Sequence, residues 1–254
     1  MQDVHRTSVA ARLHSLVSQT TGEQRVWALT GGIAFFAGLA AWGMRSLDAV
    51  ATNRSIPIWL LAILFYTAEI TVVHVKFKRN TQSFSMSEIP LVLGLFFASP
   101  LALMGAQLLG NAVALTANRR QPMLKLVFNL VQFSLVTGFT ILFFRIAAGG
   151  GEAFGTRGWI AAIVAVAFGN VAANALVHLA IRATGGNLSQ DQILEVLALS
   201  TMGAGVNASL ALLGVTLYEL QPSAAWLALL PLIVLYSAYR AHVGQKQERY
   251  RLES

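Results

Sequence analysis

The chain has 254 residues, of which 56% are hydrophobic and only 11% carry a charge. A soluble domain has about 25% charged residues, and the mean hydropathy here is +0.61, so the composition excludes an ordinary soluble protein and indicates an integral membrane protein. The net charge of +7 is spread over short clusters between apolar runs. That distribution is typical of membrane-protein loops and argues against a nucleic-acid partner. Because the chain has no cysteine, disulfides and thiolate metal sites are excluded.

Apolar runs predict about eight membrane-spanning helices, because roughly 20 apolar residues cross a bilayer as a helix. One run, residues 87–118, is too long for a single span. Pro100 divides it, since the residue before a proline is biased away from helix. The predicted spans are 26–44, 57–75, 87–99, 101–118, 123–147, 159–181, 193–217 and 223–239. The predicted fold class is therefore all-α, a polytopic membrane helix bundle.

The basic residues predict the orientation of this bundle. Basic clusters at 76–79 and 119–125 flank the divided run, so both are cytoplasmic only if the chain crosses the membrane an even number of times between them. Two short spans satisfy this condition, and one span does not. With both termini inside, 14 of the 18 Lys and Arg residues are cytoplasmic, which predicts an N-in and C-in topology. The four basic residues left outside are Arg45, Arg54, Arg145 and Arg157.

Two flanks lie outside the predicted transmembrane bundle of residues 26–239. Residues 1–25 are predicted to be a cytoplasmic leader, either a short amphipathic helix on the membrane surface or a disordered segment. Residues 240–254 are predicted to continue the last helix into the cytoplasm as a signalling helix. Its apolar face would suit a parallel homodimer, and the alternative is a monomeric basic tail. The residues on that face are Tyr236, Tyr239, Val243 and Tyr250.

Amides and carboxylates lie inside runs that are otherwise suited only to lipid. Polar side chains at membrane depth usually face the interior or line a cavity, so they predict a ligand site between the midplane and the cytoplasmic side. A small polar or amphipathic ligand would suit such a site. The alternative is that these side chains bond across helices, which contributes about 0.6 to 2 kcal/mol per bond. The candidate ligand-binding residues are Glu69, Gln107, Asn111, Gln132, Asn170, Asn174, His178 and Asn207.

Two acidic residues have more specific predictions. Glu69 lies deep in a span, where a carboxylate needs a partner, and Lys125 and Tyr66 are the predicted ones. Glu88 is predicted to start a helix, either in a capping box with Ser85 or as a favourable charge in the first turn. No His, Asp or Glu spacing has the form of a catalytic metal site, and no Ser–His–Asp set lies at one depth. We therefore expect no cofactor and no enzyme activity.

The middle of the chain is similar to a known family. The stretches at 85–110, SMSEIPLVLGLFFASPLALMGAQLLG, and 119–135, RRQPMLKLVFNLVQFSL, resemble the MASE-type multi-pass sensor regions of bacterial cyclic-di-GMP signalling proteins. The most motif-like positions are 88–90, 99–100 and 122–129. The resemblance implies an input module in the bacterial inner membrane, whose last helix runs through a sequence like ERYRLES into a GAF, diguanylate cyclase or phosphodiesterase domain. The 254 residues do not include such a domain, so no catalytic residue is transferred, and we expect that the output domain lies outside this sequence or belongs to a partner protein.

These features predict an input module and not an enzyme. We expect a membrane sensor that perceives a small ligand or a membrane cue and transmits it through its last helix to a cytoplasmic output domain or partner protein. The expected partners are the lipid bilayer, that ligand and that output domain. The main alternative is a small-molecule transporter or a permease subunit like the S-components, which also use short polar-lined bundles. A structural or assembly role is the third option.

Overall fold

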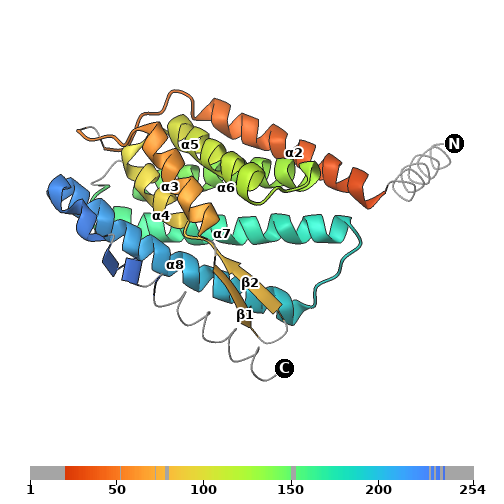
Figure 1. Cartoon of the computed structure of the whole chain (residues 1–254). Helices are drawn as coiled ribbons and strands as arrows, with labels where there is room; N and C mark the ends of the chain where they lie inside the picture. The colour runs from red at the N-terminus through yellow and green to blue at the C-terminus, as the bar shows by residue number, and fades with distance from the viewer. Residues whose placement is uncertain are drawn as a thin grey trace, which may run out of the picture.

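The structure, a computed structural model, describes residues 21–51, 53–71, 73–77, 80–149 and 153–228, and five residues between 230 and 237. Between residues 73 and 84 it describes the backbone alone. The predicted leader up to residue 20, most of the predicted last helix and all of residues 240–254 lie outside the described part. The described chain forms a bundle of helices lying side by side, with a two-stranded hairpin against it (Figure 1).

The helices follow the order of the predicted spans. They are α2 (Gly22–Gly43), α3 (Ile58–Ile70), α4 (Glu88–Phe97), α5 (Pro100–Val113), α6 (Met123–Ala148), α7 (Thr156–Ala183) and α8 (Gln190–Leu220). A π-helix, η1 (Ala114–Asn118), extends α5, and a 3-10 helix, η2 (Pro222–Ala228), follows α8. Five helices, namely α2, α5 with η1, α6, α7 and α8, are long and apolar enough to cross a membrane. The predicted helical bundle is therefore confirmed, and it is compatible with a multi-pass membrane protein.

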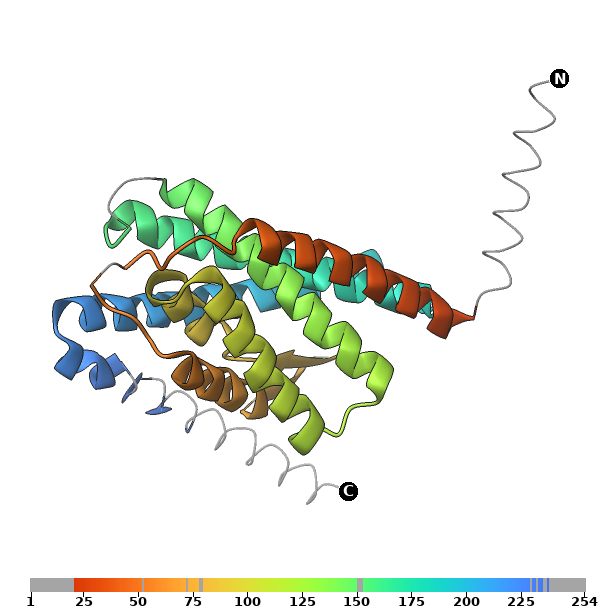
Figure 2. The same ribbon diagram turned by 90° about the horizontal axis from the view of Figure 1, so that it is seen from above.

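Successive helices run in opposite directions, so their connections gather at two ends of the bundle (Figure 1). We call the end where α2 begins the proximal end and the opposite one the distal end. At the proximal end, a Cβ on Gly22 would lie 3.1 Å from the Cα of Thr184, just after α7. At the distal end, the Ala51 N–H donates to the carbonyl of Phe96 in α4 at 2.8 Å. Figure 2 shows α2 lying along α6 on one face of the bundle.

Polar residues set the starts of several helices. Ser99 is the N-cap of α5 and accepts a hydrogen bond from the Ala102 N–H at 3.4 Å. Pro100 occupies the first helical position, where no backbone donor is lost. Because α4 ends before Ser99, the predicted division at Pro100 is confirmed. Capping boxes at Thr21 and Ser189 start α2 and α8.

The connection between α3 and α4 contains a β-hairpin that the sequence analysis did not predict. The predicted span 57–75 ends as a helix at Ile70. Strand β1 (Val73–Phe77) then pairs antiparallel with β2 (Asn80–Phe84), and the hairpin lies beside α8 (Figure 1). The sequence VHVKF alternates apolar and polar residues, which is the period of a strand. Counting apolar residues alone missed this alternation.

Two other segments are helical but of a different type from the prediction. The end of the predicted span 101–118 is the π-helix η1, which is wider than an α-helix. The predicted helix 223–239 begins as the 3-10 helix η2, and beyond Ala228 it lies largely outside the described residues. Arg119 follows η1 directly and reaches α3.

The shortest helix, α4, lies in the middle of the bundle. It packs against α3, α5, α6, α7 and α8, and seven of its ten residues are buried. At 1.5 Å per residue, α4 spans about 15 Å and α8, with 31 residues, about 46 Å. α4 therefore occupies only the distal half of the bundle. Its first residue, Glu88, lies beside the middle of α8, where Asn207 donates to it at 2.9 Å.

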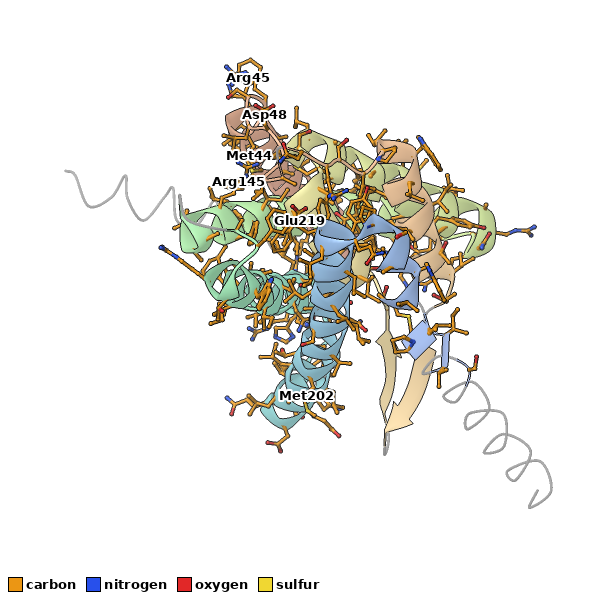
Figure 3. All side chains as sticks on the ribbon, turned by 90° about the vertical axis from the view of Figure 1, so that its left-hand side faces the viewer. Met44, Arg45, Asp48, Arg145, Met202 and Glu219 are labelled. Carbon is orange, nitrogen blue, oxygen red and sulfur yellow. The ribbon has the colours of Figure 1, made fainter. Side chains whose placement is uncertain are left out.

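Arginines and aromatic rings close the distal end, which faces the viewer in Figure 3. The Arg145 side chain of α6 donates to the carbonyl of Asp48, in the connection between α2 and α3. Arg54 of the same connection forms an ion pair with Glu219 of α8 at 3.6 Å. Beneath these contacts lies a cluster of aromatic rings whose neighbouring centroids are 5.0 to 6.4 Å apart: Phe96, Phe97, Phe144, Phe154 and Tyr218.

Candidate functional site

Glu69, near the end of α3, is buried and pairs with Arg119. The Arg119 Nη1 lies 3.0 Å from Glu69 Oε1, and the Arg119 Nη2 donates to the Glu69 carbonyl, also at 3.0 Å. Charge-assisted contacts of this kind are among the stronger hydrogen bonds in proteins. The partner is therefore Arg119, and the predicted pairing with Lys125 is wrong. Tyr66, the other predicted partner, instead accepts a hydrogen bond from Asn118 at 3.3 Å.

Gln107 and Asn111 lie one turn apart on the interior face of α5. Gln107 accepts a hydrogen bond from the hydroxyl of Thr137 in α6. Asn111 is only 1% exposed, yet neither its Nδ2 nor its Oδ1 has a hydrogen-bond partner. Leaving a buried polar group unpaired costs about 1–3 kcal/mol, so Asn111 is the candidate residue whose environment is least explained by helix packing.

Gln132 of α6 and His178 of α7 differ in how the bundle uses them. Gln132 is 4% exposed, and its Nε2 donates to the Ala173 carbonyl of α7 at 3.0 Å. His178 lies one turn further along α7, and its buried Nδ1 has no hydrogen-bond partner. Gln132 therefore joins two helices, whereas the structure shows no such contact for the His178 Nδ1.

Asn170 and Asn174 join α7 to α8. The Asn170 Nδ2 donates to the hydroxyls of Ser200 and Thr201, both at 3.0 Å. One turn later, the Asn174 Nδ2 donates to the same Ser200 hydroxyl at 3.1 Å and to the Asn170 carbonyl at 2.8 Å. The amides of Asn170 and Asn174 on α7 are thus bonded to the hydroxyl groups of Ser200 and Thr201 on α8.

Asn207 joins α8 to α4. Its Nδ2 donates to Glu88 Oε2 at 2.9 Å and to the Ser85 carbonyl at 3.0 Å. Of the two predictions for Glu88, the capping box with Ser85 is wrong, because the Glu88 carboxylate binds α8, and the position in the first turn of a helix is confirmed. Ser87 is the N-cap, without a side-chain capping bond, and its N–H donates to the Ser85 hydroxyl at 3.2 Å.

The structure therefore does not gather the candidate residues at one site, because six of the eight bond to other residues across neighbouring helices. The contacts run from α3 to the end of η1, from α5 to α6, from α6 to α7, from α7 to α8 and from α8 to α4. These are the interhelical bonds that the sequence analysis gave as the alternative to a ligand site. Asn111 and His178 are the candidates left with unpartnered buried atoms.

Two grooves on the described part of the molecule lie away from these polar contacts. One of about 480 Å³ lies between α6 and α7 and includes Phe143, Arg157 and Ile160. The other, of about 300 Å³, lies between α2, α5 and α6 and includes Gly38 and Leu108. Both linings are predominantly apolar, and neither includes one of the eight candidate residues. On helices that contact lipid, such grooves suit acyl chains and not a polar ligand.

Five residues whose side chains bond to the candidates were not among the predicted site residues: Glu88, Arg119, Thr137, Ser200 and Thr201. Arg119 was assigned to a cytoplasmic basic cluster, so its contact with α3 was not considered. Hydroxyl residues in helices often bond to a carbonyl of their own helix, and the sequence does not distinguish those from hydroxyls that face another helix. The four-residue spacing of Asn170 and Asn174 was the available signal that α7 presents a polar stripe to a neighbour.

The chemistry available in the described bundle is that of amides, hydroxyls and a few carboxylates. Among the described residues there is no group of three or more His, Asp or Glu side chains that could hold a metal ion. Such a set can hydrogen-bond a polar ligand or supply oxygen atoms to a simple cation. Comparisons of the chain with family models, with curated proteins and with solved structures find no match.

Proposed function

We propose that the chain is a membrane sensory module that perceives a small ligand or a membrane cue. It transmits this signal through α8 and the segment after it to a cytoplasmic output domain or partner protein. The observation that supports the proposal is that polar connections from three other parts of the chain converge on α8. Since the chain continues from α8 to its C-terminal segment, a shift in any of these three parts would displace the start of that segment.

The three connections are spaced along α8. Toward its proximal end, Ser200 accepts hydrogen bonds from both asparagines of α7. At its middle, Asn207 binds Glu88 of α4. At its distal end, Glu219 pairs with Arg54, which also donates to the Glu219 carbonyl at 3.3 Å. A helix held at three levels moves as a unit, so α8 is suited to collect changes from the proximal, central and distal parts of the bundle.

We further propose eight spans, with both termini in the cytoplasm and the chain in a bacterial inner membrane. The alternation of helix directions supports this topology, because it separates the basic residues of the described chain between the two ends. The distal end has Arg45, Arg54, Arg145 and Arg157, and the proximal end has Arg25, Arg119, Arg120, Lys125 and Arg182, to which the sequence adds the basic residues of both flanks. A membrane protein keeps few basic residues in its non-cytoplasmic loops. α3 and α4 are shorter than the roughly 20 residues of a full span, but five neighbouring helices surround α4.

A transporter or permease subunit remains the alternative, and one observation favours it. α4 is a half-length helix whose first residue lies inside the bundle beside polar side chains of α8. Discontinuous helices of this kind form the substrate sites of many secondary transporters near the bilayer midplane. A transporter moves its substrate across the membrane, so uptake into vesicles containing the purified chain would favour this alternative over the sensor.

Cysteine cross-linking tests whether contacts on α8 control the segment after it. Because the native chain has no cysteine, single cysteines at Val243 and Tyr250 report the spacing between two copies in membranes. Under the proposal, Arg54→Ala or Asn207→Leu changes the cross-linking rate at these positions by about threefold or more, since a small rotation realigns a helical seam. The readout is the fraction of disulfide-linked dimer against time of oxidation.

Arg45→Ala is the matched control substitution. Arg45 is also a distal arginine, but its guanidinium lies 4.0 Å from the ring of Trp42 and donates to the Trp42 carbonyl, without contacting α8. Cysteines at Gln245 and Glu248 serve as positions off the predicted seam. Unchanged cross-linking in both α8 variants, or uniform cross-linking at all four positions, would contradict the proposal.

A further inference from the structure

We propose that a small monovalent cation binds between Glu88, at the start of α4, and Asn111 of α5, with Ser87 and Asn207 beside it. The inference deepens the proposed function, on which it rests only for the role of the cation as the perceived ligand. The argument for binding has three parts: the position at which α4 begins, the unpartnered amide of Asn111, and the carboxylate of Glu88, which has no ion pair with a described residue.

The start of α4, at Glu88, marks a distinct region inside the bundle. α5, α6, α7 and α8 all pack around α4, and all of them continue past Glu88 toward the proximal end. Where α4 is present, the side chains facing it are mainly apolar, as in the contact between Gly94 and Leu103. On the proximal side of Glu88, the interior residues of α5 and α6 include the buried amides of Asn111 and Gln132. The interior therefore becomes richer in buried amides toward the start of α4.

Asn111 lies at about the same depth as Glu88. Leu103 packs on Gly94, where an added Cβ would be 3.1 Å from the Leu103 Cδ2. From this contact toward the proximal end, Asn111 is eight residues along α5, or about 12 Å, and Glu88 is six residues along α4, or about 9 Å. Leu103, Gln107 and Asn111 follow at intervals of four residues, so they share one face of α5. That face packs on α4 at Leu103 and bonds α6 at Gln107, so Asn111 lies on the interior side of α5 at about the level where α4 begins.

Asn111 has hydrogen-bonding capacity that no described residue uses. Its Oδ1 and Nδ2 are both buried and unpartnered. Nearly all buried polar groups in native proteins bond to protein, water or a ligand. Gln107, one turn away on the same face, shows the usual situation, because it accepts a hydrogen bond from Thr137. The Asn111 Oδ1 is therefore free to coordinate a cation.

Glu88 supplies the negative charge that such a cation needs. Its carboxylate accepts a hydrogen bond from Asn207, which is uncharged. The ion pairs between described side chains involve Glu69 and Glu219, and they do not include Glu88. A carboxylate at membrane depth is expensive unless it is paired. A bound cation would balance the charge of Glu88 and would at the same time satisfy the amide oxygen of Asn111.

The residues around this region favour a monovalent ion. Carboxylate, amide and hydroxyl oxygens are ligands of hard cations, but calcium and magnesium sites draw on more carboxylates or on bound phosphate. Because only 1% of Asn111 is exposed, an occupant in contact with its amide would be an ion or one water and not an organic molecule. Glu88 and Asn207 are partly exposed, which gives an ion a route to the site.

Thermal unfolding of the purified full chain in detergent tests this proposal. The midpoint is measured in sodium, potassium, lithium or choline chloride at one ionic strength. We expect one of the three alkali cations to raise the midpoint by several degrees over choline in a saturable way. Glu88→Gln should abolish this shift, because it removes the only negative charge at the proposed site. Asn111→Ala should weaken the apparent affinity about tenfold or more, because it removes one oxygen ligand.

Matched controls separate the site from general effects of charge and packing. Glu219→Gln removes a carboxylate at the distal end, and Asn129→Ala removes an amide that donates to Gln121 at 2.8 Å. Both variants should keep the full cation-dependent shift. If Glu88→Gln does not fold, equilibrium binding of the stabilising cation to the native chain and to Asn111→Ala, by isothermal titration calorimetry, gives the same comparison.

Several outcomes would overturn the cation site. They are equal midpoints in all four salts, an undiminished shift in Glu88→Gln and Asn111→Ala, or stabilisation by acidification alone, which would mean that a proton satisfies Glu88. The cross-linking assay keeps this inference apart from the sensor proposal. Cation binding without any change in cross-linking at Val243 would contradict the sensor and leave the site standing. If cross-linking responds to the substitutions on α8 but no cation binds, the cation site is contradicted and the sensor proposal stands.

Discussion

The backbone of α5 at Gly110 lies directly against the backbone of α3 at Ala62. A Cβ atom on Gly110 would collide with the Ala62 carbonyl oxygen and would lie only 2.8 Å from the Tyr66 nitrogen. Small residues permit such close approach in membranes, where packing and hydrogen bonds associate helices. The contact holds α3 along α5, and it thereby brings Glu69 within reach of Arg119.

Gly110→Ala is expected to destabilise the bundle by about 1–3 kcal/mol, because the added methyl group overpacks a backbone contact that has no flexible side chain to yield. Thermal or denaturant unfolding in detergent measures the loss. Gly105→Ala is the matched control on the same helix, since its Cβ would lie 3.5 Å from the Ile58 Cδ1, an ordinary contact. Equal losses in the two variants would show that Gly110 is not a special contact.

Arg119→Gln is expected to destabilise the chain more than Glu69→Gln. Without Arg119, the Glu69 carboxylate, whose side chain is 7% exposed, loses its cation. We expect the free energy of unfolding to fall by about 2 kcal/mol. This is less than for a fully buried pair, because the Arg119 side chain is 33% exposed. Without the Glu69 charge, Arg119 turns toward solvent at a cost of about 1 kcal/mol or less. Arg120→Gln, at the neighbouring exposed arginine, is the control. The opposite order of stabilities would refute the pairing.

The hydrogen bonds from Asn170 and Asn174 of α7 to the hydroxyl groups of α8 are expected to show energetic coupling. In a double-mutant cycle, Asn170→Ala and Thr201→Ala should couple by about 0.5–1.5 kcal/mol, the range found for hydrogen bonds between membrane helices. Ser209→Ala is the control partner, because its hydroxyl donates to the Gly205 carbonyl within α8. Unfolding free energies of the single and double variants give the coupling. If Asn170 and Thr201 do not couple, or if Asn170 and Ser209 couple as strongly, the hydrogen bond between Asn170 and Thr201 does not stabilise the bundle.

Reporter fusions are expected to show an even number of crossings between the two basic clusters. Fusions after Arg79, Arg120 and Ser254 should report a cytoplasmic location, and a fusion after Asp48 a location across the membrane. The readout is the ratio of an enzyme reporter active outside to one active inside. A non-cytoplasmic result at Arg120 alone would reduce the number of spans to seven, because α4 would then not cross.

Local sequence rules predicted the helices well where the apolar composition agrees with the residues that start and stop helices. Ser99 and Pro100 form a capping residue followed by a proline in the first turn, and α5 begins there. The end of α3 was not predicted, because Val73 and Val75 continue the apolar count while belonging to an alternating strand. A strand in a membrane protein depends on pairing with its neighbour, and composition carries little of that information.

The interior polar residues were predictable as a set, but their partners were not. Spacings of four residues show that Asn170 and Asn174 share a face, and this requires only the helical period. Which helix that face meets depends on the packing of the whole bundle. The end of η1 is the clearest example, because Arg119, which follows η1 directly, pairs with Glu69, and the prediction had assigned this role to Lys125.

The central position of α4 has a consequence for biogenesis. A helix of ten residues is too short to enter the bilayer by itself, so α4 is expected to insert together with α5, to which only Ala98 and Ser99 connect it. Its most extensive packing, however, is with α8, which the ribosome makes about 100 residues later. During that interval α4 would be exposed to lipid or held by a chaperone or insertase, and its burial would be a late step that commits the nascent chain to its final arrangement.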